Sequence, residues 1–413
     1  MTPVKARVMA PISTDSPEPE VVLDLSRLLS RVRHATPTGI DRCEMAYARG
    51  LLAAIPERLH FGAVHPIGRY GRLERDAALG FLDETEHRWL DNAEARAPLR
   101  REAARMLWAL RPRPVPAPRR EGGRVYVQPS PNNLTNGPLV RSVLRREQAR
   151  YLCLVHDLIP IQYPEYAVPG GDALHRRRVE TMAREADGLI ANSQATLDAI
   201  RPYLDRVPRR RRTAVAALGV ETVAAPPPAA PDRPYFVCIG TIEPRKNHLL
   251  LLHLWRAMSE ARGAAAVPRL ILIGRRGWEN EQVVDMLERC PALAGCVEER
   301  TGLPDRAMRS LLAGARALLL PSFAEGYGMP VSDALAMGVP VLCSDLPALR
   351  EGGNVPDFLD PLDGPAWRRA IEDYAMPASP MRQAQLDRMR EWTAPTWHRH
   401  IAILLDMLHK VGS

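Results

Sequence analysis

The feature that most constrains the fold is a series of short, continuously apolar runs that alternate with helical stretches. Before residue 222 the runs are VYVQ (125–128), YLCLVHD (151–157), GLIANS (188–193) and TAVAALGV (213–220). After residue 234 they are YFVCIGT (235–241), LILIGR (270–275), ALLLPS (317–322) and VPVLCS (339–344). Strands that lack apolar–polar alternation are typical of parallel sheets covered by helices on both faces. The pattern therefore predicts an α/β protein.

A Pro- and Ala-rich segment, TVAAPPPAAPDRP (222–234), separates the two sets of runs and is typical of a linker. We predict a first domain over 1–221, a second over 235–390, and a C-terminal helix within 391–413 that packs back on the first domain. Each domain should be Rossmann-like and doubly wound, and the two should face each other across a cleft. Ligands of such sheets bind beyond the carboxyl ends of the strands, so the residues after each strand are the candidates.

The charge is concentrated in the first half of the chain. Residues 1–220 contain 35 Lys and Arg against 25 Asp and Glu, whereas residues 221–413 contain 21 against 23. A basic half fits an anionic partner such as a membrane surface, a diphosphate lipid or nucleic acid. The alternative is a general use of arginine, since only three of the 56 basic residues are lysines. Five phenylalanines and no aromatic–basic interleaving argue against nucleic acid, so we expect no nucleic-acid partner.

The composition also bears on compartment and cofactors. No apolar run approaches the roughly 20 residues of a transmembrane helix, and the start of the chain lacks the apolar stretch of a signal peptide. We expect a cytoplasmic protein, with peripheral contact at the inner face of an anionic membrane as a further prediction. The six cysteines form no CxxC pair, which favours buried thiols over disulfides or zinc ligands. No metal and no cofactor are predicted.

The first strand after the linker ends in GTIEPRKN (240–247), followed by the helical HLLLLHLW. Arg245 and Lys246 stand just before the helix, where backbone N–H groups, helix dipole and cations favour a diphosphate. The alternative is a solvated helix start with Glu243 and Arg245 paired on the surface. The next strand ends in the basic GRRGW (274–278), and neither loop has the GxGxxG or GxxxxGK[ST] spacing of dinucleotide or ATP sites.

The stretch PSFAEGYGMPVSDALAMG (321–338) contains two acids that flank a glycine loop. Glu325 precedes a predicted helix and should face the cleft, while Gly326 and Gly328 permit close approach of the backbone to a ligand. Asp333 is predicted in the first helical turn, where the helix dipole favours an acid. Carboxylates eight positions apart can accept hydrogen bonds from hydroxyls at the two ends of an extended ligand, such as a sugar nucleotide.

EPRKN together with PSFAEGYGMPVSDALAMGVPVLCSD (321–345) resembles the motifs of the GT4 family of retaining glycosyltransferases, which have the GT-B fold. The resemblance covers residues 235–363. It implies that Glu325 contacts the donor sugar, that Asp333 binds the ribose, and that Lys246 with Arg245 neutralises the leaving diphosphate. The other implied donor contacts are Gly240, Thr241, Arg275, Gly326, Tyr327, Gly328 and Met329. This chain departs from the family pattern in having Asp333 for Glu, and Thr241 where many members have Arg.

Three segments of the first domain also resemble that family: PTGIDRCEMAYARGL (37–51), VHDLIPIQYPEY (155–166) and ANSQAT (191–196). The resemblance implies a catalytic His156 that faces the donor sugar. It also implies an acceptor side formed by Gly39, Asp41, Arg42 and Asp157. A core position for His156, and helix-start roles for Asp41 and Arg42, are the structural alternatives.

The resemblance implies a retaining hexosyltransferase in polysaccharide biosynthesis, acting on a glycan or lipid-linked acceptor. GDP-mannose is the first predicted donor, followed by UDP- and dTDP-sugars. No DxD motif is present, which fits metal-independent transfer. The acceptor proton goes to the leaving phosphate, or Glu325 acts as a nucleophile as in retaining glycosidases; the sequence leaves both open. The alternatives with the same fold are a GT-B epimerase and a phosphorylase, which would need Lys246 for its cofactor. Two further alternatives are a dinucleotide oxidoreductase, whose glycine fingerprint this sequence lacks, and a basic nucleic-acid-binding protein.

Overall fold

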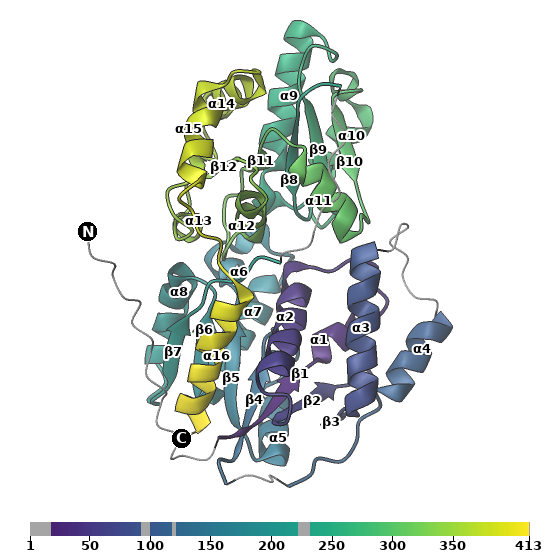
Figure 1. Ribbon diagram of the computed structural model, residues 1–413, viewed down its shortest axis with the longest axis vertical. Helices are drawn as coiled ribbons and strands as arrows, with labels where there is room; N and C mark the ends of the chain where they lie inside the picture. Colours follow the sequence, from purple (N-terminus) through teal and green to yellow (C-terminus); the bar gives the residue numbers. More distant parts are fainter. Residues whose placement is uncertain (1–17, 92–99, 118–120, 222–231, 413) are drawn as a thin grey trace, which may run out of the picture.

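The computed structural model describes residues 18–91, 100–117, 121–221 and 232–412. It consists of two α/β domains stacked along the long axis, and the C-terminal helix returns to the first of them (Figure 1). Most of the predicted linker, residues 222–231, lies outside the described residues.

The first domain is built on a seven-stranded sheet of order β3-β2-β1-β4-β5-β6-β7, in which only the β2–β3 pair is antiparallel. Its strands are β1 (Glu20–Asp24), β2 (Leu59–Val64), β3 (Tyr70–Arg72), β4 (Arg124–Gln128), β5 (Arg150–Val155), β6 (Gly188–Ala191) and β7 (Arg212–Val215). Its helices are α1 (Ser26–Ser30), α2 (Gly39–Ala54), α3 (Arg75–Asp91), α4 (Arg100–Ala109), α5 (Gly137–Glu147), α6 (Ile159–Gln162), α7 (Gly171–Glu185) and α8 (Gln194–Asp205). The strand order reverses between β1 and β4, which is the switch point of a doubly wound sheet.

The second domain repeats this topology in a six-stranded parallel sheet of order β10-β9-β8-β11-β12-β13. Its strands are β8 (Tyr235–Ile239), β9 (Arg269–Ile273), β10 (Val297–Arg300), β11 (Leu318–Leu320), β12 (Val341–Ser344) and β13 (Asp357–Leu359). Its helices are α9 (His248–Arg262), α10 (Glu281–Arg289), α11 (Asp305–Ala313), α12 (Met329–Ala336), α13 (Pro347–Arg350), α14 (Gly364–Ala375) and α15 (Pro380–Met389). Here the switch point lies between β8 and β11.

Each of the eight predicted apolar runs contains a strand, so the prediction of two doubly wound α/β domains is confirmed. Both faces of the sheets are buried, as that pattern requires. Val21 and Leu23 of β1 belong to one apolar cluster of the first domain, and Val22 between them belongs to the other. The strands that the pattern missed are β1, β2, β3, β10 and β13, which are polar, short or interrupted by glycine.

The last helix, α16 (Trp397–Gly412), lies along the first domain beside α2 and the sheet, as predicted (Figure 1). It buries Ile401, Leu404, Met407 and Leu408 in the core of that domain. Its apolar face is therefore used within the molecule. Among the described residues, no helix has the length and apolarity needed to cross a bilayer.

A buried ion-pair network holds the edge of the first sheet. Glu147, at the end of α5, is fully buried and lies 2.7 Å from Arg72 and 3.0 Å from Arg124. The Tyr70 hydroxyl donates to the same carboxylate at 2.5 Å, and Arg124 also pairs with Glu20 at 2.8 Å. Removal of one partner from such a network leaves uncompensated buried charge.

We predict that Glu147→Gln lowers the free energy of unfolding by about 3 kcal/mol, because two buried guanidinium groups lose their shared carboxylate. Urea unfolding followed by far-UV circular dichroism measures the loss. Glu180→Gln is the control, since its pair with Arg184 is exposed and is worth about 0.5 kcal/mol or less. Equal stability of the two variants would contradict the role of the network.

Candidate active site

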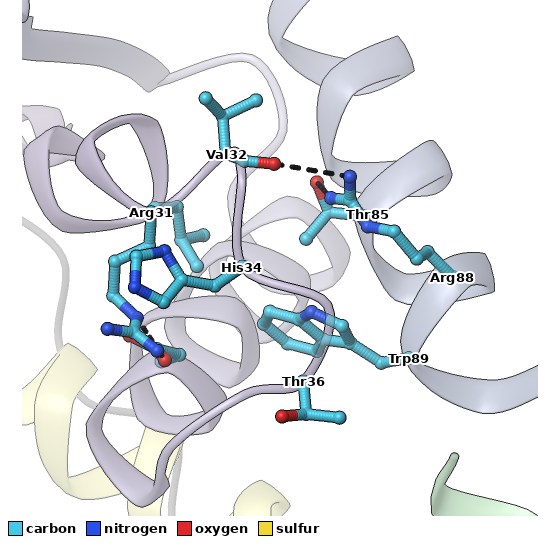
Figure 2. A pocket seen from close by; sticks show the side chains of 9 residues that line it. Arg31, Val32, His34, Thr36, Thr85, Arg88 and Trp89 are labelled. Carbon is cyan, nitrogen blue, oxygen red and sulfur yellow. Dashed lines mark hydrogen bonds and ion pairs between the residues drawn. The ribbon is translucent and has the colours of Figure 1, made fainter. Parts of the chain in front are cut away.

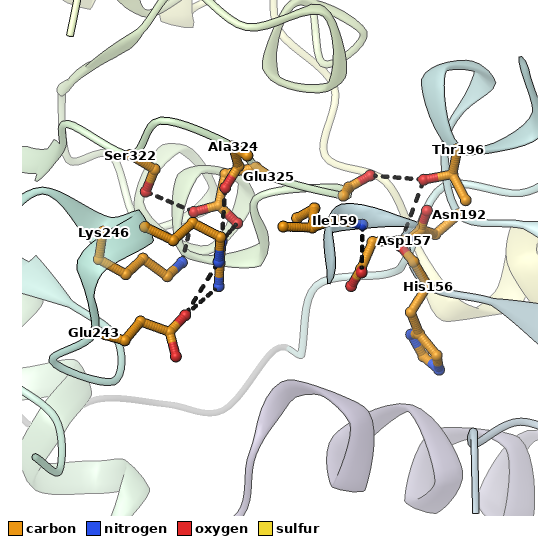
Figure 3. A network of polar contacts seen from close by, with 12 residues as sticks. His156, Asp157, Ile159, Asn192, Thr196, Glu243, Lys246, Ser322, Ala324 and Glu325 are labelled. Atoms are coloured by element: carbon orange, nitrogen blue, oxygen red, sulfur yellow. Dashed lines mark hydrogen bonds and ion pairs between the residues drawn. The ribbon is translucent and has the colours of Figure 1, made fainter. Parts of the chain in front are cut away.

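Three of the predicted catalytic residues meet at the switch point of the second sheet (Figure 3). The Glu325 carboxylate, on the loop after β11, lies 2.5 Å from Lys246 Nζ and 3.1 Å from Arg245 Nη1. The Ser322 hydroxyl donates to the same carboxylate at 2.7 Å. The Glu325 side chain is only 8 % exposed. The fold thus places a buried acid beside two cations from a loop that lies 79 residues earlier in the chain.

The loops after β8 and β9 meet through glycines. Gly240 has a φ of +152°, which favours glycine, and a Cβ on Gly274 would lie 1.8 Å from the Gly240 carbonyl oxygen. Lys246 lies against this junction, with Nζ 3.8 Å from where a Cβ on Gly240 would be. Thr241 is half-buried beside them. Arg275 is exposed; its carbonyl accepts from Ile242 N at 2.9 Å, and its side chain makes no ion pair within the described ranges.

The β8 loop is fixed to the Glu325 loop by main-chain contacts. Pro244 begins a 3₁₀ turn, Pro244–Lys246, and Phe323 N donates to the Arg245 carbonyl at 2.8 Å. Arg245 in turn donates to the Ala324 carbonyl at 2.6 Å. The alternative pairing of Arg245 with Glu243 also forms, at 2.6 Å, but Glu243 is buried, so it is not a surface pair.

The charges of this cluster hold the acid ionised. Burial alone would raise the pKa of Glu325, but Lys246, Arg245 and their hydrogen bonds outweigh burial and lower the pKa to about 2. The same carboxylate raises the pKa of Arg245 above its usual value against the effect of burial. Glu325 is thus an anion at every pH at which the protein is expected to work.

The Glu325 loop also lies against the first domain. The Ser193 hydroxyl, at the start of α8, donates to the Gly326 carbonyl at 2.8 Å. A Cβ on Gly326 would lie 2.3 Å from the His156 carbonyl oxygen and 2.8 Å from Asp157 Cβ. Glycine is therefore required at 326 by contact with the end of β5.

The next residues continue this contact. The Tyr327 hydroxyl donates to the Leu218 carbonyl at 2.8 Å, so its side chain joins the domains. Gly328, with a φ of +88°, precedes α12, and a Cβ on Gly39 would lie 3.2 Å from Met329 Sδ. The starts of α2 and α12 therefore touch.

The predicted helix-start position of Asp333 is wrong. Because α12 begins at Met329, Asp333 is its fifth residue and lies beyond the first turn. It is half-buried, and burial raises its pKa to about 6, opposed by Arg309 and Arg42. The helix dipole therefore does not explain an acid at position 333. A binding role for Asp333 stays a prediction.

Arg42 joins the two domains, and its acceptor-side role stays a prediction. Its guanidinium donates two hydrogen bonds to Asp305 of α11, at 2.6 and 2.5 Å, and lies 3.6 Å from Glu221. Arg309 donates to the Glu221 carbonyl at 2.9 Å. Asp305 is 263 residues from Arg42, so the sequence contained no local signal for this pair.

The remaining first-domain candidates have identified partners. Asp41 caps α2 together with Thr38 and pairs with Arg27 and Arg31 at 2.6 and 2.8 Å. These contacts are those of the helix-start role that the sequence left open for Asp41. Asp157 accepts a hydrogen bond from Ile159 N at 3.1 Å.

His156 Nε2 is 2.7 Å from the Pro129 carbonyl, and the ring points away from the Glu325 cluster (Figure 3). Burial lowers the pKa of His156, so the imidazole is neutral near pH 7 and Nε2–H is the donor to that carbonyl.

Sequence reasoning missed two residues near these positions. Ser322, which holds Glu325, directly follows the apolar run of β11, and the strand-end rule could have found it. Arg178 of α7 has a buried Nε with no hydrogen-bond partner among the described residues, and burial together with the charge of Arg27 lowers its pKa, opposed by Asp157. Within the part of the chain that the structure describes, no His, Cys, Asp and Glu side chains gather as metal ligands. The cysteines are free thiols, and all but Cys290 are buried.

Two doubly wound domains whose strand-end loops meet are the arrangement of the GT-B fold. Residues 233–374 match the model of the family described as glycosyl transferases group 1. The chain is 26% identical over 233 residues to the serotype-specific mannosyltransferase WbdA of Escherichia coli, a match covering 50% of this chain and 27% of that protein. It is 40% identical over 118 residues to O-antigen chain mannosyltransferase B of Escherichia coli, covering 28% of this chain and 30% of that protein. The chain thus spans less than a third of the length of these curated relatives.

Solved structures resemble the whole chain at low sequence identity. Sucrose-phosphate synthase from Thermosynechococcus elongatus superimposes with a TM-score of 0.63 at 14% identity, covering 95% of this chain and 98% of that one. Anabaena Alr3699/HepE in complex with UDP gives a TM-score of 0.55 at 16% identity, covering 94% and 99%. The chain therefore has the GT-B fold, and residues 233–374 match the group 1 glycosyl transferase model, which confirms the predicted resemblance to GT4 glycosyltransferases.

The lowered pKa of Glu325 predicts a pH-dependent contribution to stability. The contribution is complete above the ordinary pKa of 4.5 and is lost as the pH falls toward 2. We expect the difference in unfolding free energy between the wild type and Glu325→Gln to shrink by about 2 kcal/mol between pH 6 and pH 3. Glu391→Gln, at an exposed acid with no ion pair in the described structure, should show no such change. A pH-independent difference for Glu325→Gln would show that the ion pairs do not hold this carboxylate.

Proposed function

We propose that this protein transfers a hexose from a nucleotide diphosphate sugar to a glycan or lipid-linked glycan in polysaccharide biosynthesis, with retention and without a metal ion. The observation that carries the proposal is the placement of Lys246 and Arg245 against Glu325 at the switch point of the second sheet. Similarity to two mannosyltransferases supports mannose, and we propose GDP-mannose as the first donor to test, before UDP- and dTDP-sugars.

In this proposal the cations stabilise the leaving diphosphate. Lys246 has three N–H groups, of which one serves Glu325, so two are available to a phosphate oxygen. The first turn of α9 begins two residues further on, and its backbone N–H groups also favour an anion. Fixed charges that face a developing anion are usually the largest contribution to catalysis.

Glu325 is proposed to position the donor sugar and not to attack it. Its Oε1 accepts from Lys246 and Ser322, and its Oε2 pairs with Arg245. A carboxylate with a pKa of about 2 is a weak base and a weak nucleophile. We therefore propose that the leaving phosphate accepts the acceptor proton, while Asp333 binds the ribose of the donor.

The rivals with the same fold are separated by their products. An epimerase converts a nucleotide sugar without an acceptor, and a phosphorylase requires inorganic phosphate. Neither would release nucleoside diphosphate in proportion to a glycan acceptor. Contact with an anionic membrane stays a proposal that is supported only by the basic first half of the chain.

The donor is identified by thermal stabilisation of the purified protein with GDP-, UDP- and dTDP-sugars in the presence of EDTA. We expect one base to raise the melting temperature by several degrees, because a ligand at about 100 times its Kd stabilises by about 2.7 kcal/mol. A shift that appears only after a divalent cation is added would refute metal independence. The absence of any shift would favour the reading as a basic nucleic-acid-binding protein.

Variants of the cluster test the assigned roles with that donor. We expect Glu325→Ala to abolish transfer and Lys246→Ala to lower kcat at saturating donor by about 100-fold, because the leaving group loses a fixed charge. Lys410→Ala is the matched control, since Lys410 is exposed on α16 and pairs with Asp406. Release of nucleoside diphosphate measures the rate, and the anomeric configuration of the product is read by NMR. Near-normal turnover of Glu325→Ala, or a change in KM alone for Lys246→Ala, would refute these roles.

A further inference from the structure

The outer edge of the first domain combines exposed apolar side chains with arginines. Trp108, near the end of α4, is 68 % exposed, and Ile67, in the turn between β2 and β3, is 64 % exposed. Figure 1 shows α4 on the outer side of α3, at the edge of the domain. Apolar residues scattered singly over a surface need no explanation, but these two belong to one surface.

One imidazole ties the two positions together. The Ile67 N–H donates to His65 Nδ1 at 3.3 Å, so the opposite ring nitrogen, Nε2, is the donor to the Leu107 carbonyl at 2.9 Å. That carbonyl belongs to the peptide bond that precedes Trp108. Because His65 is buried, the turn that carries Ile67 is fixed against the end of α4.

The fold covers the tryptophan of α3 but leaves Trp108 open. Trp89, near the end of α3, is 7 % exposed and lies between that helix and the segment that carries His34 and Thr36 (Figure 2). Trp108 instead has the guanidinium of Arg111 over its ring, 4.3 Å from the centroid, and most of its side chain faces solvent. An exposed indole beside cations is typical of a surface that meets the boundary between water and lipid.

The exposed face of α4 is cationic. Ala103 and Leu107 pack against the core of the first domain. Arg101, Arg105 and Trp108 are exposed and follow one another at helical spacing, so they share the outward face. No carboxylate pairs with either arginine in the ranges that the structure describes.

The acid of α4 does not neutralise this face. Burial lowers the pKa of Arg88 on α3, and the charges of Glu84 and Glu102 oppose that effect, so Glu102 lies toward α3. The turn adds another exposed cation, Arg69, which has no carboxylate partner among the described residues. Together these residues form the α4 surface: Ile67, Arg69, Arg101, Arg105, Trp108 and Arg111.

The α4 surface lies at the end of the sheet that forms the candidate site. β2 runs parallel to β1, and the turn that carries Ile67 follows β2, so it is at the carboxyl end of the first sheet. The same end of β5 contacts the Glu325 loop through Gly326. A partner bound to the α4 surface is therefore at the end of the sheet that meets the second domain, and not at the opposite end.

We infer that the α4 surface docks the protein on an anionic lipid bilayer. Trp108 and Ile67 enter the headgroup region, and the arginines contact the lipid phosphates, which lie around an apolar interior. Two apolar side chains are a small core for the roughly 1,200 Å² that a stable protein interface buries, so a lipid surface fits better than a protein partner. The inference goes beyond the proposed function, because it concerns where the protein docks and not what it transfers.

Co-sedimentation of the full chain with sucrose-loaded vesicles tests the docking. Phosphatidylcholine vesicles with and without about 30 % phosphatidylglycerol are compared at low salt and at about 0.5 M NaCl. We expect binding to the anionic vesicles alone, and weaker binding at high salt because the lipid charge is screened. Absence of binding to the anionic vesicles at low salt would overturn the inference.

Variants locate the contact on the α4 surface. Trp108→Ala should weaken binding to anionic vesicles about tenfold, because an apolar side chain at the interface is lost. The double variant Arg101→Gln/Arg105→Gln should weaken it about 25-fold, at about fivefold for each arginine. Trp108→Phe should still bind, but vesicles with brominated acyl chains should no longer quench its tryptophan fluorescence as they do in the wild type. Unchanged quenching would show that Trp108 does not enter the lipid, which also overturns the inference.

Two matched controls remove the same groups elsewhere. Leu362→Ala removes an apolar side chain of the second domain that is even more exposed than Trp108. Arg145→Gln/Arg146→Gln removes two exposed charges from α5, in the same basic half of the chain. Both controls should bind vesicles as the wild type does. Equal weakening by either control would show that general charge or exposure, and not the α4 surface, carries the contact.

Other partners give different results in the same experiments. Self-association that Trp108→Ala abolishes, seen by sedimentation velocity without vesicle binding, would assign the surface to a second copy of the chain. Binding of single-stranded RNA that depends on Arg101 and Arg105, again without vesicle binding, would assign it to nucleic acid. Either result overturns the inference.

Donor binding is measured without vesicles for every variant and should be unchanged, since the α4 surface is separate from the donor contacts. If the donor binds and the vesicles do not, only the docking inference fails. If the vesicles bind and no nucleotide sugar does, the proposed function fails and the docking surface stands.

Discussion

The ion pair between Glu325 and Lys246 is the interaction on which the geometry of the candidate site depends. Without the carboxylate, Lys246 and Arg245 would repel each other on the loop after β8. Without the cations, a carboxylate this buried would be protonated. The carboxylate and the cations thus offset the cost of burying each other's charge. The cations are in place before a ligand binds. Such preorganisation is what a site for a leaving diphosphate requires.

The contact between the domains is made of two different kinds of interaction. At the strand ends it is polar and local: Ser193 with the Gly326 carbonyl, Arg42 with Asp305, and Glu351 with the N–H groups at the start of α8. At α16 the contact is apolar, because that helix, which follows the second domain in the chain, buries its apolar face in the core of the first domain. The polar ties can break one at a time at modest cost, whereas α16 keeps the chain of the second domain anchored.

Local signals in the sequence predicted the parts of the site that depend on few residues. Lys246, Arg245 and Glu325 lie on the loops after β8 and β11, and the reversal of strand order brings those strand ends together. Because α12 starts at Met329, Asp333 is its fifth residue and lies outside the predicted first turn. Arg42 could not be assigned, because its partner is set by the packing of two domains and not by spacing.

The same limit explains β1, which begins with Glu20. An acid inside an apolar strand is acceptable only because Arg124, 104 residues later, pairs with it on the neighbouring strand. Pairing of this kind is invisible before the sheet order is known. It also shows that some of the arginine in the first half of the chain serves structural ion pairs.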